Sequence, residues 1–155
     1  VHFLFVGGGS LWPRVKAFAE EHGLRNVTCL PYQPKERLSG SLSAADLHAV
    51  VMGDPFVGIV HPCKIYNILA LGIPFLGVGP AECHLADLAA RVRDRRYAMA
   101  VATGDVDGAV AAIRAAAERG PLEPSEELRA LGAEYSQARL MPRFVELVER
   151  AARGA

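Results

Sequence analysis

Short apolar runs alternate with longer segments of helical periodicity along most of the chain. The apolar runs predict strands at residues 3–6, 27–30, 47–52, 74–78 and 97–102. The segments between them predict helices at 13–22, 35–45, 63–71, 83–93 and 105–119, with one or two more after Ser125. Because the strands are apolar without alternation, we expect helices to cover both of their faces. The pattern therefore predicts an α/β fold with an open, doubly wound parallel sheet.

Within single elements the pattern is specific enough to assign faces and ends. The helix at 83–93 directs Leu85, Leu88, Ala89 and Val92 toward the core. Ser125 is expected to cap the helix that follows it. The run at 3–6 is expected to be a buried strand.

Composition narrows the class of protein. The 155 residues are 51% hydrophobic and carry 17 basic and 17 acidic side chains, so the formal charge is zero. A nucleic-acid-binding protein would normally show a basic excess, and we therefore expect no nucleic acid partner. No apolar run approaches the roughly 20 residues of a membrane span. The three cysteines form no CxxC pair, which favours a reduced, cytoplasmic chain.

The chain shows no internal linker, so we expect residues 1–155 to form one domain. It begins inside an apolar run, without Met or a basic leader segment. We therefore expect it to be a fragment of a longer polypeptide.

Ligands of open parallel sheets bind at the carboxyl ends of the strands, which directs attention to the loops there. The glycine-rich turn with Gly8 and Gly9 follows the first strand and would allow close backbone approach to a ligand. It lacks the third glycine of the dinucleotide fingerprint, because Trp12 stands there, and it is not a P-loop. The same residues also fit a tight turn that needs positive φ.

The segment from His61 to Lys64 is more informative, because it ends a long loop and opens a helix. Free N–H groups at such a helix start bind anions, and Lys64 places a cation where the helix dipole disfavours one. This combination suggests a bound anion such as a diphosphate. Asn67 lies one turn further on, on the same face, and could bind sugar hydroxyls. An ordinary solvated lysine and an exposed asparagine are the alternatives.

Tyr32 and Gln33 follow the second strand, where a ring could stack on a base and an amide could read its edge. They are also flanked by prolines, as turn residues often are. The five histidines show no cluster and no HExxH spacing, although His61 and His84 fall in successive loops. We therefore expect no metal site.

Four segments, residues 3–9, 26–32, 62–74 and 102–105, resemble one known family. The first two are similar to the succession FxFxGxG…NVxFLxY of GT-B glycosyltransferases, in particular the donor-binding half of the retaining family 4 enzymes. The third resembles their PSKxYExLAxGxP segment, and the fourth resembles their late xxGD. The end of the chain from Tyr135 is also similar, so the resemblance covers nearly the whole sequence.

This resemblance implies a Rossmann-like C-terminal half that binds a nucleotide-diphospho-sugar, with an N-terminal acceptor domain as its partner. Lys64 and the helix start at Cys63, with His61 before it, would hold the diphosphate. Asn67 would bind the ribose, Tyr32 and Gln33 would frame the base, and Gly8 and Gly9 would allow close approach. The donor is expected to be uridine-linked, and neither a cofactor nor a metal is expected.

The sequence departs from the family pattern in three ways. The paired glutamates are absent, with Asn67 in place of the second and Asp54 as the nearest carboxylate, so no catalytic residue is assigned. Cys63 replaces a serine. The chain resembles a domain that lacks its first strand. The acceptor domain would be missing as well. Because half of the cleft is then absent, we expect the chain alone to have little or no activity.

The expected function is donor binding in a retaining glycosyltransferase of polysaccharide or glycan biosynthesis. A nucleotide-sugar epimerase-like domain and a non-catalytic nucleotide-binding module are the alternatives. The whole protein is expected in the cytoplasm or at the inner face of the membrane. Near the C-terminus, an apolar stripe is typical of core packing, but in a fragment it would be exposed and favour homo-oligomers. The stripe consists of Leu140, Phe144, Leu147 and Val148.

Overall fold

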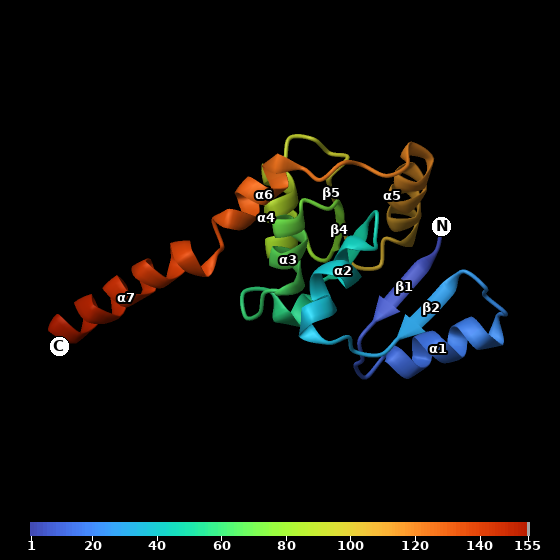
Figure 1. Cartoon of the computed structure of the whole chain (residues 1–155), viewed down its shortest axis with the longest axis horizontal. Coiled ribbons are helices and arrows are strands. Elements are labelled where there is room, and N and C mark those ends of the chain that lie inside the picture. Colours follow the sequence, from blue (N-terminus) through green and yellow to red (C-terminus); the bar gives the residue numbers. More distant parts are fainter. Residues whose placement is uncertain (155) are drawn as a thin grey trace. The chain divides into compact units, whose positions relative to one another are not determined.

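The structure is a computed structural model that describes residues 1–154 (Figure 1). The chain folds into two compact units, Val1–Ala45 and a second that begins at Asp46. Each unit contains a parallel sheet, with strands β1 and β2 in the first and β3, β4 and β5 in the second. The predicted α/β class with open parallel strands is confirmed. That residues 1–155 form a single domain stays a prediction.

The first unit is a short strand–helix–strand arrangement. Its strands are β1 (Phe3–Val6) and β2 (Val27–Leu30), which pair in parallel with Phe3 opposite Val27. Helix α1 (Trp12–Glu21) connects them. The predicted helix at 35–45 is broken into a 3-10 helix, η1 (Lys35–Arg37), and a short α2 (Leu38–Ser43).

The prediction that residues 3–6 form a buried strand is wrong on burial, although the strand itself is present. Phe3 is 38% exposed and Val6 is 40% exposed, and no residue of Val1–Ala45 is buried. The physical reason is the small number of elements around β1. Within its sheet β1 pairs with β2 alone, and a two-stranded sheet with short helices cannot enclose both faces of an apolar strand.

The second unit carries the larger sheet, in the order β3–β4–β5, with all strands parallel. Its strands are β3 (His48–Val51), β4 (Phe75–Val78) and β5 (Ala98–Val101). Its helices are η2 (Asp54–Phe56, a 3-10 helix), α3 (Lys64–Leu71), α4 (His84–Arg91), α5 (Val106–Arg119), α6 (Glu126–Ala133) and α7 (Gln137–Arg153). Helices α3, α4 and α6 lie on one side of this sheet and α5 on the other (Figure 1).

The core of the second unit is centred on β4. Phe75 and Leu76 are buried, as expected for a central strand of a parallel sheet. The predicted core face of α4 is confirmed: all its members are at most 3% exposed, namely Leu85, Leu88, Ala89 and Val92. Gly77 lets α4 lie close to β4, because a Cβ there would stand 3.0 Å from the Leu85 Cβ.

Helix α6 packs along α3 and has its predicted cap. The Ser125 Oγ accepts a hydrogen bond from the Leu128 N–H at 3.2 Å, which satisfies a free donor at the helix start. Gly132 faces α3 so closely that a Cβ would lie 3.0 Å from the Leu69 Cβ. The two helices are therefore fixed against each other by a small residue at their contact.

Helix α7 leaves α6 and runs away from the sheet of its own unit (Figure 1). It has no buried residue, and its apolar stripe is exposed, from 43% at Leu140 to 63% at Phe144. Of the two expectations for this stripe, core packing is therefore wrong and exposure is confirmed. Two ion pairs, each between residues four positions apart, contribute to this helix: Arg150–Glu146 at 2.8 Å and Arg153–Glu149 at 2.7 Å.

Candidate functional site

The carboxyl ends of β3, β4 and β5 meet at one edge of the second unit, because these neighbouring strands are parallel. The loops that follow them, residues 52–63, 79–83 and 102–105, therefore share this edge. Four of the sequence-predicted donor-binding residues belong to the second unit: His61, Cys63, Lys64 and Asn67. The other four belong to the first unit: Gly8, Gly9, Tyr32 and Gln33.

Lys64 is the first residue of α3, and its amine lies against strand β3. The Nζ donates a hydrogen bond to the Ala49 carbonyl at 2.8 Å. Backbone groups of alternate residues in a parallel strand point to opposite sides, and His48 and Met52 already bond toward β4. The Ala49 carbonyl therefore faces the other edge of β3. Lys64 supplies the hydrogen-bond donor that this edge carbonyl needs.

The environment of Lys64 makes its charged form less favourable than it is in water. The residue is exposed as a whole, yet the protein around its amine removes enough water to lower the pKa below its ordinary value. Desolvation is the cause of this shift, and an anion beside the amine would oppose it. A cation in this state gains more from a bound anion than a fully hydrated lysine does.

Two histidines that are separate in sequence come together at this edge. The rings of His61 and His84 stack with centroids 4.1 Å apart and planes 5° from parallel. The Tyr66 hydroxyl lies 2.9 Å from the His61 Nδ1 and 3.2 Å from the His84 Nε2. The expectation that the histidines do not cluster is therefore wrong for this pair. Their positions in the loops after β3 and β4 could have indicated this proximity, because these strands are adjacent and parallel.

Tyr135, in the junction between α6 and α7, packs against Tyr66 and His84. Its ring centroid lies 5.0 Å from that of Tyr66 and 5.6 Å from that of His84, which it meets edge-on. The Tyr135 hydroxyl accepts a hydrogen bond from the Arg91 Nη1 at 3.1 Å. Arg91 in turn binds both carboxylate oxygens of Glu134, at 2.8 and 2.7 Å. Sequence reasoning missed Tyr66, Tyr135 and Arg91, since only packing brings them to the histidines.

The electrostatics favour the neutral forms of His84 and Tyr66. Burial lowers the pKa of His84, and the neighbouring His61 adds to the effect, while Asp87 opposes it and Arg91 reinforces it. Burial raises the pKa of Tyr66, with smaller contributions from Tyr135 and Cys63. The phenol therefore keeps its proton near neutral pH and can both donate and accept a hydrogen bond.

The remaining predicted residues of the second unit lie at the same helix start. The Cys63 Sγ donates to the His61 carbonyl at 3.5 Å, a weak contact that shapes the loop before α3. Asn67 lies one turn after Lys64 in α3 and is exposed, as the sequence predicts. Asp54, which sequence reasoning set aside, accepts a hydrogen bond from the Thr103 hydroxyl at 2.7 Å. That bond ties the loop after β3 to the loop after β5.

In the first unit, the glycine-rich turn makes room for a side chain of the same unit. A Cβ at Gly8 would stand 2.9 Å from the Tyr32 Cε2, so the tyrosine ring lies directly against this glycine. Gly9 has a φ of +138° with nothing near it, which supports the interpretation as a turn that needs positive φ. Gln33 donates to the Pro31 carbonyl at 3.0 Å. The Tyr32 side chain itself is largely exposed.

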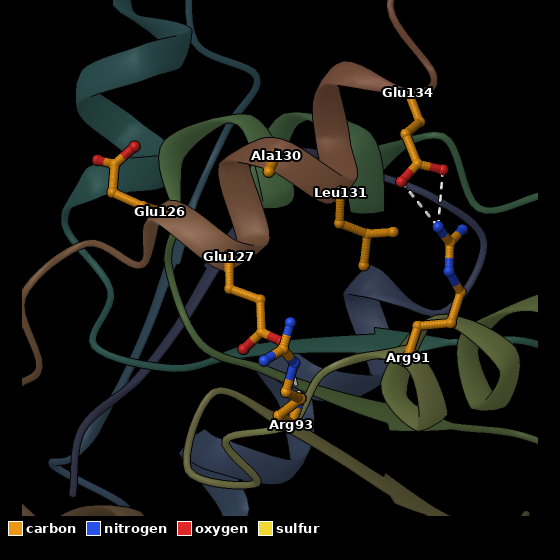
Figure 2. Close-up of a pocket in the computed structure, with 7 residues that line it drawn as sticks. All are labelled: Arg91, Arg93, Glu126, Glu127, Ala130, Leu131 and Glu134. Atoms are coloured by element: carbon orange, nitrogen blue, oxygen red, sulfur yellow. Dashed lines mark hydrogen bonds and ion pairs between the residues drawn. The ribbon is translucent and has the colours of Figure 1, made fainter.

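A pocket of about 620 Å³ lies between α6 and the C-terminal end of α4 (Figure 2). Its charged lining groups are all in ion pairs. Arg91 pairs with Glu134 at 2.7 Å and Arg93 with Glu127 at 3.6 Å, while Glu126 pairs at 2.6 Å with Arg129, which lies outside the lining. None of the sequence-predicted site residues lines it. Because its charges are already matched, we place the candidate site at the carboxyl edge of the sheet.

Within residues 1–154, no group of three or more His, Cys, Asp or Glu side chains is arranged to hold a metal ion. Over the same residues, none of the helices combines the length and the apolar character needed to cross a membrane.

Comparison with known proteins gives similarity to glycosyltransferases in both sequence and structure. No protein-family model matches the chain. A stretch of 70 residues is 37% identical to WcaI of Escherichia coli (strain K12), a colanic acid biosynthesis glycosyl transferase. This match covers 45% of the chain but 17% of WcaI.

Among solved structures, the chain is similar to AviGT4, a glycosyltransferase involved in avilamycin A biosynthesis. The TM-score is 0.68 at 19% identity, over 99% of this chain and 44% of AviGT4. The chain thus spans less than half the length of either protein. At this level of identity the structural likeness concerns the fold, which is the open parallel, Rossmann-like fold of GT-B glycosyltransferases.

Proposed function

We propose that this chain is the donor-binding domain of a retaining GT-B glycosyltransferase that acts in polysaccharide or glycan biosynthesis. The observation that carries the proposal is the 37% identity to a glycosyl transferase over 70 residues, in a chain that shares its fold with a second glycosyltransferase. The remaining part of the enzyme would be an acceptor-binding domain outside this chain.

The chemistry of the carboxyl edge fits the diphosphate of a nucleotide-sugar. Helix α3 begins there, and its dipole favours an anion, while the N–H groups of Ile65 and Tyr66 already donate to backbone carbonyls. Lys64 stands at that start, and its amine would exchange the Ala49 carbonyl for a phosphate oxygen. Transfer of the sugar leaves negative charge on the departing diphosphate, and such charge is best stabilised by groups fixed in advance.

The other site residues keep their proposed roles within their own units. Asn67 would bind the ribose hydroxyls from α3. In the first unit, Tyr32 presents an exposed ring for a base, uracil in our proposal, and Gln33 lies next to it. The glycine-rich turn at Gly8 and Gly9 would allow close approach, although the Tyr32 ring already occupies the space beside Gly8. The proposal assigns no cofactor, no metal and no catalytic residue.

Lys64 gives the most direct test. Isothermal titration calorimetry of the full-length protein with uridine diphosphate should show binding, and Lys64→Met should weaken it about tenfold or more, since charge-assisted hydrogen bonds to phosphate contribute roughly 1.5–3 kcal/mol. Lys16→Met is the matched control, because it removes an equally charged side chain from an exposed pair in α1. Circular dichroism would show that Lys64→Met still folds without the bond to Ala49. Unchanged affinity in a folded Lys64→Met variant would refute the phosphate role.

Sugar transfer by the full-length protein would distinguish an enzyme from a non-catalytic nucleotide-binding module. A nucleotide-sugar epimerase would instead convert the donor into its epimer in the absence of an acceptor.

A further inference from the structure

The hydroxyl of Tyr66 lies within hydrogen-bond distance of both imidazoles, those of His61 and His84. It lies 2.9 Å from one ring nitrogen and 3.2 Å from the other. A hydroxyl has one hydrogen to donate, so when both bonds are made with neutral rings, one ring accepts from Tyr66 and the other donates to it. The tautomers of the two rings are therefore coupled.

The stacking of the rings limits how much charge they can hold. With centroids 4.1 Å apart, two imidazolium ions would repel each other strongly. The pair can therefore hold one added proton more easily than two. With one added proton, the His61 Nδ1 and the His84 Nε2 can both donate to the Tyr66 hydroxyl.

The surroundings of the pair supply one nearby carboxylate, Asp87. The groups that act on His84 are His61 from the loop, Tyr66 from α3, Tyr135 from the α6–α7 junction, and Asp87 and Arg91 from α4. The Arg91 guanidinium is itself occupied by Glu134. Asp87 is the one carboxylate among these groups. An external anion would place further negative charge beside a protonated pair and stabilise it.

The pair also lies where an anion is expected. His61 comes three residues before Lys64, in the loop that leads into α3, and His84 is the first residue of α4. Both belong to the carboxyl edge formed by adjacent strands β3 and β4. His61 is exposed, so a ligand can reach the pair from the side of His61.

We propose that His61, Tyr66 and His84 form an anion site that takes up one proton from solvent when the diphosphate of the donor binds. This inference rests on the proposed function for the identity of the ligand. No bond is formed or broken in the protein: the anion binds, one imidazole becomes imidazolium, and the Tyr66 hydroxyl reorients to accept from it. Binding should therefore be tighter at lower pH.

The test uses UDP-glucose with the full-length protein, because a diphosphate diester keeps a constant charge where a phosphate monoester titrates with a second pKa of about 6. Calorimetry should give an affinity that is about fivefold higher at about pH 6 than at about pH 8. His84→Gln and Tyr66→Phe should reduce this ratio to below about twofold. His22→Gln is the control, since His22 ends α1 in the first unit. In parallel, NMR should show the His84 ring titrating at higher pH when sulfate is added.

The outcomes separate this inference from the proposed function. Binding that depends on Lys64 but keeps its pH ratio in His84→Gln would overturn the inference and leave the donor-binding function intact. A sulfate-dependent shift of the His84 titration without UDP-glucose binding would support an anion site and count against the nucleotide-sugar as its ligand. A His84 titration that sulfate leaves unchanged would overturn the site itself.

Discussion

Single glycines determine how closely helices α3 and α6 approach each other. Gly72 ends α3 in the left-handed conformation, with a φ of +75°. A Cβ there would lie 2.8 Å from both the backbone N and O of Ser125, the residue that caps α6. The Ser125 N–H also donates to the Gly72 carbonyl at 2.9 Å. Gly72 therefore links the end of one helix to the beginning of another.

Gly72→Ala should consequently destabilise the fold by about 2–4 kcal/mol, because it combines an unfavourable positive φ with a clash against backbone. Gly104→Ala is the matched control: its φ of +83° is also positive, but nothing lies near its Cβ position. That variant should cost only about 1 kcal/mol. Urea denaturation followed by circular dichroism measures both, and equal losses would contradict the role given to the Ser125 contact.

Asp94 provides a prediction for pH dependence. Hydrogen bonds from the Arg96 side chain, the shortest 2.6 Å, lower the pKa of this carboxyl to about 2 from its ordinary 3.8. Because the folded-state pKa is the lower one, the stabilisation is present above about pH 4 and is lost as the pH falls toward 2. NMR titration of the carboxyl carbon should show a higher pKa in Arg96→Ala and no change in Arg93→Ala. An equally low Asp94 pKa in both variants would exclude the Arg96 side chain as its main cause, since the backbone N–H of residue 96 still donates to Asp94 in either variant.

Among the elements, α4 and α7 show that the burial of an apolar helix face depends on what surrounds the helix. Both carry an apolar stripe at helical spacing. In α4 the stripe packs on β4 and β5 and is buried, whereas in α7 it remains exposed. The periodicity alone therefore predicts a helix and its apolar face, but not whether that face is covered.

This contrast can be measured with two leucines. Leu88→Ala in α4 removes a side chain that is 0% exposed and should cost about 2–5 kcal/mol through lost burial and the cavity left behind. Leu147→Ala in α7 changes a side chain that is 60% exposed and should cost less than about 0.5 kcal/mol. Denaturation should be done at low protein concentration. A large loss in Leu147→Ala would show that α7 packs in solution against something absent from this chain's own fold.

At the scale of the whole molecule, the exposed stripe of α7 is an extended apolar surface with charged residues around it. Soluble proteins rarely leave a contiguous apolar surface of this kind uncovered. The expectation from the sequence is that this stripe favours homo-oligomers, in which other copies of the chain would cover it.

Sedimentation of the chain should therefore show a species larger than the 16.6 kDa monomer. Phe144→Glu combined with Leu147→Glu should convert it to a monomer, because charged side chains in such a contact cost far more than they gain. Arg139→Gln, on the same helix but outside the stripe, should leave the association unchanged. A monomeric unmodified chain would contradict self-association through α7.

Much of the fold and part of the site are determined by the sequence alone. The order of strands and helices, the core face of α4 and the cap at Ser125 follow from local periodicity and hydrogen-bonding preferences, which act within a few residues. The same patterns place His61, Cys63, Lys64 and Asn67 at the beginning of α3, and the parallel topology puts that beginning at the edge where ligands bind.

Only the tertiary structure decides which side chains meet there. His61 and His84 are in separate loops, and the packing of β3 beside β4 is what stacks their rings. The Lys64 amine reaches Ala49, fifteen residues away, because an edge carbonyl of β3 lacks another donor. The exposure of β1 and of α7 likewise depends on what covers them. These features result from contacts between distant parts of the chain, whose geometry no local pattern encodes.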